Sequence, residues 1–153
     1  MLTTQYSQQD DTKTKPNRPG GLYCSYVKMG DQLYISGQTS RVDDCVMQGR
    51  LGDTLTIDDG KKAAQLCARN VLDQVDQFCH DNAAEIKATI KLQVFMQATE
   101  SFNDHAKVAD GASEYLQEKL GEQGRHCRTA VGVASLPRGA AVEIDAIFEL
   151  VSD

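Results

Sequence analysis

The chain has 153 residues, of which 41% are hydrophobic and 25% are charged, and its formal net charge is −6. This length suits one domain with a substantial core, so we expect a single soluble domain. The negative charge repels a phosphate backbone, and no run of more than two consecutive Lys or Arg residues occurs, which disfavours nucleic acid as a partner. No apolar run approaches the roughly 20 residues of a membrane-spanning helix, so we expect no membrane partner.

The cysteines are odd in number and show no CxxC spacing; they are Cys24, Cys45, Cys67, Cys79 and Cys127. This pattern favours reduced thiols in a cytoplasmic protein over a disulfide framework or a zinc site. The histidines also lack the spacing of metal ligands, so we expect no metal.

The first 20 residues, MLTTQYSQQDDTKTKPNRPG, are polar and contain two prolines. They lack the charged start and apolar core of a signal peptide. We therefore expect a flexible N-terminal arm over residues 1–20 and one folded domain over residues 21–153.

Two β-rich runs open the domain between Leu22 and Ser40. They read LYCSYVKM and QLYISGQTS, and the Gly30-Asp31 pair between them predicts a tight turn in an antiparallel hairpin. The next segment, RVDDCVMQGRLGD, mixes Gly and Asp with few apolar residues, which predicts a loop with a short edge strand.

Two amphipathic segments predict helices. Thr56 followed three residues later by Asp59 is typical of a capping box, and apolar residues at spacings of three or four extend this helix to residues 80–82. A second helical pattern runs from Ser101 to Leu120 and ends near Gly121. Between the two helices, residues 86–94 alternate between apolar and polar side chains, which predicts a strand with one buried face.

The C-terminal segment supplies the last two predicted strands. Residues 128–136 and 141–151 are β-rich and flank a Pro137-Arg138-Gly139 turn, so we expect them to form a hairpin. The element order is then ββ(β)-α-β-α-ββ. This order predicts an α+β domain with a mixed sheet and both helices packed on one face.

The predicted hairpin decides which side chains of the last strands face the helices. Burying residues such as Ile144 places Thr129, Val131 and Val133 on the core face, while Arg128, Ala130, Gly132 and Ala134 face away beside Glu143. The same alternation puts Cys127 on the core side. Six residues of strand separate Arg128 from the level of Glu143, so one site uses both only if neighbouring chains contribute them. A solvated strand end, or a pair with Glu149, is the alternative interpretation of the arginine.

Three stretches carry a family resemblance: LYISGQT at residues 33–39, AAQLCARNVLDQV at residues 63–75 and RTAVGVASLPRGAAVEIDAIFEL at residues 128–150. In these stretches the chain resembles the YjgF/Rid family, the reactive intermediate deaminases, and specifically a longer, less characterised branch of it. The resemblance implies a chorismate-mutase-like α+β fold and a homotrimer whose sheets face inward. It also implies ligand pockets between subunits and no cofactor.

The resemblance assigns roles to individual residues. Arg128 matches the arginine that grips the substrate carboxylate, a task suited to a planar, always-charged fork of donors. Glu143 matches the glutamate that positions or activates water. The remaining matched positions are expected to bind substrate: Tyr23, Ser36, Gly37 and Asp110. The chain departs from the family at Asp110, where relatives have Asn, and at Ala130, where many have Cys.

The activity that the resemblance implies is hydrolysis of 2-imino or 2-enamino acids, such as 2-aminoacrylate, to 2-keto acids and ammonia. An imine is already electrophilic, so such an enzyme needs mainly to hold the carboxylate and to supply one proton-shuttling group near water. A non-catalytic trimer that binds or senses 2-keto acids is the alternative function, and an endoribonuclease is the third. The expected partners are a small carboxylate-bearing ligand and further copies of the chain.

Overall fold

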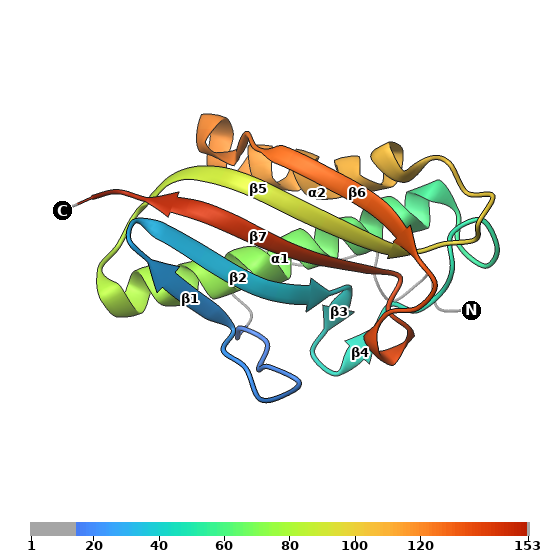
Figure 1. Ribbon diagram of the computed structural model, residues 1–153, viewed down its shortest axis with the longest axis horizontal. Helices are drawn as coiled ribbons and strands as arrows, with labels where there is room; N and C mark the ends of the chain where they lie inside the picture. The colour runs from blue at the N-terminus through green and yellow to red at the C-terminus, as the bar shows by residue number, and fades with distance from the viewer. Residues whose placement is uncertain (1–14, 153) are drawn as a thin grey trace.

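The computed structural model describes residues 15–152. Its elements are β1 (Tyr26–Met29), β2 (Gln32–Thr39), β3 (Arg41–Val42), β4 (Cys45–Val46), α1 (Ile57–Asn82), β5 (Ile86–Gln97), α2 (His105–Leu120), the 3-10 turn η1 (Gly121–Gly124), β6 (Cys127–Val133), the 3-10 turn η2 (Pro137–Gly139) and β7 (Val142–Leu150). Five strands form one sheet in the order β1-β2-β7-β5-β6, and β3 pairs with β4. Both helices lie on one side of this sheet, as Figure 1 shows, so the predicted α+β architecture is confirmed.

The predicted arm falls mostly outside the described residues, which begin at Lys15. Hydrogen bonds from α1 and β3 reach the part that is described. Nε2 of Gln74 on α1 donates to the carbonyl of Asn17 at 2.7 Å, and Nη2 of Arg41 on β3 donates to the carbonyl of Arg18 at 3.2 Å. Residues 17 and 18 therefore lie against α1 and β3.

The opening hairpin is confirmed, because β1 and β2 pair antiparallel around a turn in which Gly30 has a φ of 59°. Pairing begins at Tyr26 rather than at Leu22. Further along, β2 contains a bulge, since Ile35 pairs with Ala146 but Gln38 pairs with Ile144. Two residues of β2 thus stand opposite one residue of β7, which bends the strand locally.

The capping box at the start of α1 is confirmed. The hydroxyl of Thr56 accepts from the backbone N–H of Asp59 at 3.1 Å, and Oδ2 of Asp59 accepts from the N–H of Thr56 at 3.0 Å. These two bonds satisfy backbone donors that the first turn of a helix leaves open. Helix α2 begins at His105, four residues after the predicted start.

The core fills the space between the helices and the sheet. Its largest fully buried apolar side chains come from β2, the β4–α1 connection, both helices, β5 and β7: Leu33, Leu51, Val71, Val75, Leu92, Val94, Met96, Leu116, Ile144, Phe148 and Leu150. Within β5 and β7 these residues alternate with half-buried ones, which gives the sheet one apolar face toward the helices.

The predicted hairpin of the last two strands is wrong. Strand β6 pairs with β5 in parallel, at the edge of the sheet, while β7 lies between β2 and β5. Helix α2 connects β5 to β6, and a strand–helix–strand crossover of this kind returns the chain in a parallel direction. The short link after β6 passes the end of β5 and contacts another segment instead, since Ala140 bridges to Gln48.

The predicted face of β6 is also wrong. Arg128 and Ala130 stand beside Leu92 and Val94 of β5, which are buried against the helices, so the arginine lies on the helix side of the sheet. Cys127 and Val131 are exposed on the other side. The prediction failed because it took the facing direction from an antiparallel partner that β6 does not have.

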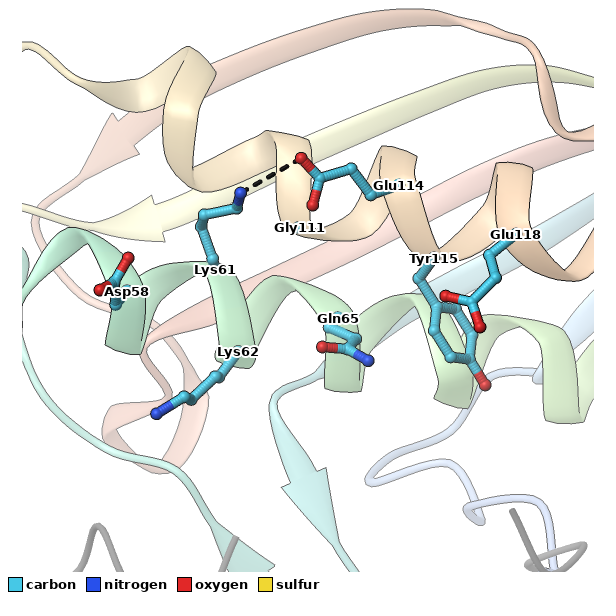
Figure 2. Close-up of a pocket in the computed structure, with 8 residues that line it drawn as sticks. All are labelled: Asp58, Lys61, Lys62, Gln65, Gly111, Glu114, Tyr115 and Glu118. Carbon is cyan, nitrogen blue, oxygen red and sulfur yellow. Dashed lines mark hydrogen bonds and ion pairs between the residues drawn. The ribbon is translucent and has the colours of Figure 1, made fainter. Parts of the chain in front are cut away.

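Gly111 of α2 lies against the backbone of α1 near Lys61 (Figure 2). A Cβ atom at this position would overlap the backbone carbonyl of Lys61 on α1. Glycine therefore lowers the helix propensity of α2 but allows the two backbones to pack together. Nearby, Nζ of Lys61 forms an ion pair with Glu114 of α2 at 3.2 Å.

We predict that Gly111→Ala lowers the free energy of unfolding by roughly 1–3 kcal/mol, because overpacking against a backbone outweighs the gain in helix propensity. Urea unfolding measures this change. Gln117→Ala, on the exposed side of the same helix, should stay within about 0.5 kcal/mol of the wild type. A Gly111→Ala protein as stable as the wild type would contradict the close approach.

Candidate functional site

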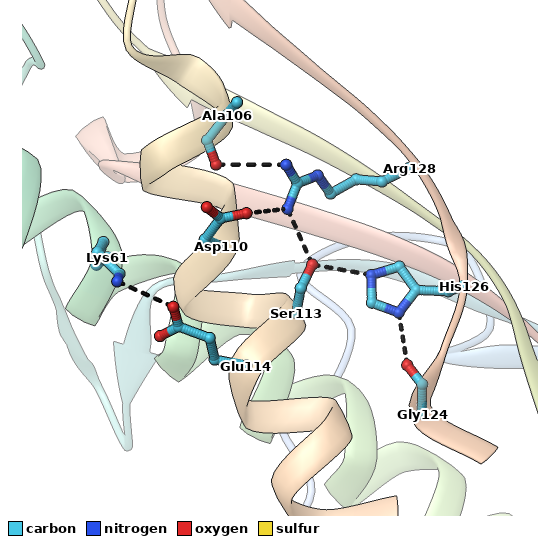
Figure 3. A network of polar contacts seen from close by, with 8 residues as sticks. All are labelled: Lys61, Ala106, Asp110, Ser113, Glu114, Gly124, His126 and Arg128. Carbon is cyan, nitrogen blue, oxygen red and sulfur yellow. Dashed lines mark hydrogen bonds and ion pairs between the residues drawn. The ribbon is translucent and has the colours of Figure 1, made fainter. Parts of the chain in front are cut away.

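The guanidinium of Arg128 is held by α2 (Figure 3). Its Nη1 donates to Oδ1 of Asp110 and to Oγ of Ser113, both at 2.9 Å, and its Nη2 donates to the carbonyl of Ala106 at 3.3 Å. The three acceptors lie on successive turns of one helix, so they fix the plane of the fork. The structure therefore brings together two of the predicted site residues, Arg128 and Asp110.

Ser113 is in turn oriented by His126. The ring nitrogen Nδ1 of His126 lies 2.6 Å from the carbonyl of Gly124, and Nε2 lies 2.9 Å from Oγ of Ser113. Because a carbonyl only accepts, Nδ1 carries a proton, and in the neutral ring Nε2 then accepts from the serine hydroxyl. The serine oxygen keeps its lone pairs for Arg128, so the histidine helps to hold the guanidinium.

Sequence reasoning did not select Ser113 or His126 as site residues. The available signal was the spacing of three residues between Asp110 and Ser113, which places both on one face of α2. This spacing indicates a shared partner only when it is known that α2 covers β6.

The other predicted site residues form a second group around the bulge of β2. A Cβ atom at Gly37 would overlap the carboxylate of Glu143, so the bulge leaves room for this side chain. Beside it, Oγ of Ser36 donates to the carbonyl of Cys24 at 2.7 Å, which ties β2 to the segment before β1. Tyr23 in that segment is 53% exposed, and its hydroxyl accepts from the N–H of Gly20 at 3.3 Å.

Glu143 has a perturbed acidity. Partial burial raises the pKa of its carboxyl group, and the nearby charge of Asp145 raises it further. Burial also raises the pKa of Asp145, although a hydrogen bond from Gln93 at 3.1 Å and the charge of Lys91 oppose this shift. The open side of the sheet therefore carries a carboxyl group that keeps its proton to a higher pH than an exposed glutamate does.

The two groups do not meet within one chain. Arg128 is level with Leu92 and Ala146 across the sheet, and Glu143 lies three residues from Ala146 along β7, a distance of about 10 Å. Two strand spacings of roughly 5 Å each separate β6 from β7, and the two side chains point to opposite faces. Arg128 with Asp110 is thus one group of candidate residues, and Glu143 with Gly37, Ser36 and the Tyr23 segment is another; we call these two groups half-sites.

Cys127 does not lie on the core side as predicted. It is exposed, and its thiol donates to the carbonyl of Ile90 at 3.2 Å. Its neighbours His126 and Arg128 direct their side chains toward α2, on the other side of the sheet. The three residues are therefore adjacent in sequence, but the thiol of Cys127 lies apart from the two basic side chains.

Two hollows in the described part of the chain lie away from these residues. One lies between α1 and α2 and carries charges of both signs; its lining is Asp58, Lys61, Lys62, Gln65, Gly111, Glu114, Tyr115 and Glu118 (Figure 2). The other lies at the end of the sheet beside Phe78 and Leu150. Neither hollow contains a predicted site residue.

Residues 15–152 contain no group of three or more His, Cys, Asp or Glu side chains that could hold a metal ion. Neither helix of this part of the chain combines the length and the apolar character needed to cross a membrane.

Comparison with known proteins agrees with the fold and the motifs. The profile of the family described as "YjgF/chorismate mutase-like, putative endoribonuclease" matches residues 17–148. The chain belongs to this family. Its sheet of mixed direction with two helices on one face is therefore the YjgF/chorismate-mutase-like fold.

The chain is similar to three known proteins over most of its length. Protein TCP17 of Trypanosoma cruzi is 45% identical over 135 residues, which are 86% of this chain and 83% of that protein. The crystal structure of Atu1372 from Agrobacterium tumefaciens, a protein of unknown function, superposes with a TM-score of 0.82 at 38% identity and covers 88% of this chain and 86% of its own. The 2-iminobutanoate/2-iminopropanoate deaminase of Dermatophagoides farinae is 28% identical over 130 residues, or 85% of this chain and 87% of that enzyme.

The raised pKa of Glu143 predicts a stability that depends on pH. A folded acid with a raised pKa binds its proton more tightly than the unfolded chain does, so the free energy of unfolding falls as the pH rises from the ordinary value of about 4.3 through the folded value. Glu143→Gln removes this loss. The variant should therefore gain stability relative to the wild type between pH 4 and pH 7 in urea unfolding.

Glu118→Gln, at an exposed position of α2, is the matched control and should show the same difference from wild type at both pH values. If Glu143→Gln changes the free energy of unfolding by the same amount at pH 4 and at pH 7, the charged form of this carboxyl group is not destabilised in the folded protein.

Proposed function

We propose that this protein hydrolyses 2-imino and 2-enamino acids to 2-keto acids and ammonia, in a homotrimer that joins the two half-sites across each subunit boundary. The observation that carries this proposal is the fixed guanidinium of Arg128. Three bonds to α2 hold it, and 21% of the side chain remains exposed.

The donors of Arg128 can be counted. A guanidinium has five N–H groups. The bonds to Asp110, Ser113 and Ala106 use both on Nη1 and one on Nη2. The Nε–H and the second N–H of Nη2 take no part in these bonds, and 21% of the side chain is exposed. These two donors suit a carboxylate held by both oxygens.

Glu143 supplies the proton chemistry in this proposal. Its raised pKa brings the carboxyl group nearer to neutral pH, where a group can both take up and release a proton. A water molecule adds to the C=N carbon while Glu143 removes its proton, and the π electrons move to nitrogen. Glu143 then returns this proton to the nitrogen of the carbinolamine. The C–N bond breaks and ammonia leaves, while the hydroxyl oxygen forms the carbonyl and gives its proton back to Glu143. An enamine first gains a proton at carbon to become the imine.

The open side of the sheet supports the homotrimer. Apolar side chains of β1, β2 and β6 are between 40% and 70% exposed there: Val27, Met29, Tyr34 and Val131. Exposed apolar residues on a sheet face are typical of a surface that another subunit covers. Covering this face would also exclude water from around Glu143.

The Dermatophagoides farinae relative, named as an imine deaminase, supports the same chemistry, although its identity of 28% leaves the activity of this chain as our proposal. The formal charge of −6 does not favour the endoribonuclease alternative.

Release of keto acid from an imine tests the proposed activity. We generate 2-aminoacrylate in situ from serine with a dehydratase and expect the wild type to accelerate pyruvate formation over buffer. Arg128→Ala and Glu143→Gln should each lower the rate by about 100-fold or more, because they remove the carboxylate clamp and the proton-transfer group.

Arg125→Ala is the matched control, since Arg125 is 72% exposed, pairs with Glu122 and lies three residues from Arg128. It should keep the wild-type rate. A wild type that gives no acceleration over buffer would end the deaminase proposal.

Assembly is tested by a charge on the open face. Val131→Glu should convert a trimer into smaller species in light scattering and reduce the deaminase rate with it, because a buried unpaired carboxylate opposes association. Gln117→Glu adds the same charge on the exposed side of α2 and should leave the trimer intact. A wild-type mass of one chain would contradict a site shared between subunits.

A further inference from the structure

Asp110 lies one hydrogen bond away from the proposed carboxylate clamp. Its Oδ1 accepts from Nη1 of Arg128 at 2.9 Å, and the two side chains are 50% and 21% exposed. The pair is therefore at the surface, where a ligand can reach it. Because ligand-binding arginines work by their positive charge, a carboxylate at this distance changes what the site attracts.

The second oxygen of Asp110 remains for another donor. Among residues 15–152, the hydrogen bond of Asp110 is the one to Arg128 through Oδ1. A carboxylate accepts at both oxygens, so Oδ2 can take a further N–H. The site thus presents two N–H donors from Arg128 and, beside them, one carboxylate acceptor.

The charges of this pair form a dipole with no net charge. A ligand with a carboxylate and no positive group is attracted by Arg128 and repelled by Asp110. A ligand that carries a carboxylate next to a positively charged N–H group places each charge against its opposite and makes a charge-assisted hydrogen bond at each end.

This difference separates the substrate of the proposed reaction from its product. A protonated 2-imino acid has an N–H⁺ group on the carbon next to its carboxylate. A 2-keto acid has, at the same place, an oxygen with lone pairs that faces the lone pairs of Asp110. A keto acid bound there would displace water from the exposed Asp110 carboxylate and would offer it no donor in return, whereas the N–H⁺ group of the imino acid replaces that water.

We infer that Asp110 is a specificity-determining residue, which makes the site select zwitterionic 2-imino and 2-amino acids over 2-keto acids. This inference rests on the proposed carboxylate-binding role of Arg128. It disfavours a protein that senses 2-keto acids, and it gives an enzyme that releases its keto acid product readily.

Direct binding of two matched ligands tests the inference. L-2-aminobutyrate and 2-oxobutyrate have the same carbon skeleton and differ at the group that faces Asp110. In isothermal titration calorimetry on the full chain, the wild type should bind the amino acid roughly tenfold or more tightly. Asp110→Asn keeps the shape of the side chain and removes its charge, so it should lose this preference and bind 2-oxobutyrate about tenfold better than the wild type does.

Ser113→Ala is the matched control, because it removes another bond to the same Nη1 atom of Arg128 but leaves the Asp110 carboxylate. It should weaken the binding of both ligands by the same factor and keep the ratio of their affinities. Loss of the preference in Ser113→Ala would assign the effect to the position of Arg128 and overturn the inference. A wild type that prefers 2-oxobutyrate, or that binds neither ligand, would also overturn it.

The binding experiment and the activity assay can give independent results. A wild type that prefers the amino acid but does not accelerate imine hydrolysis would refute the deaminase proposal and leave the ligand selectivity in place. A wild type that hydrolyses imines but prefers 2-oxobutyrate would support the deaminase proposal and refute the ligand selectivity.

Discussion

The parallel pairing of β5 with β6 is the constraint on which the candidate site depends. It follows from α2, which crosses over the sheet between these two strands and brings β6 back in the same direction. The crossover places α2 directly over the strand that it leads into. Arg128 therefore meets one face of α2, and its guanidinium finds three acceptors there that no neighbouring strand could provide.

The same arrangement divides the candidate functional residues between the two sides of the sheet. The helix side receives Arg128 and the residues that hold it, and the open side receives Glu143, for which the β2 bulge and Gly37 leave room. In the trimer that we propose, the edge strand and the open face of different subunits would come together. A fold of this size can thus divide one reaction between a rigid anion-binding element and a separate proton-transfer element.

Local sequence patterns predicted most of the elements but not the register of the last strands. The capping box at Thr56 and the strict alternation in β5 depend on near neighbours and were readable from the sequence. The alternation in β6 shows that two faces exist, but which face is buried depends on the parallel partner, and the short link to β7 suggested a hairpin. The contact of Ala140 with Gln48, which directs that link elsewhere, joins segments far apart in the chain.

The candidate site was predictable where a family motif names the residue. Arg128 and Asp110 were assigned in this way and do meet, even though the predicted face of the arginine was wrong. Ser113 and His126 belong to no motif, and their hydrogen bonds exist because a helix lies over a strand. The bulge at Gly37 was likewise absent from the alternation pattern, since a bulge is an interruption of that pattern.

The pairing of Arg128 with Asp110 also affects how a ligand arrives. An isolated arginine produces a long-range field that raises the encounter rate of anions and makes that rate sensitive to ionic strength. The field of a close ion pair falls off much faster with distance. A ligand would therefore reach this site by unassisted diffusion and recognise it only at contact, so salt concentration would matter far less to capture than the fit of the two charges does.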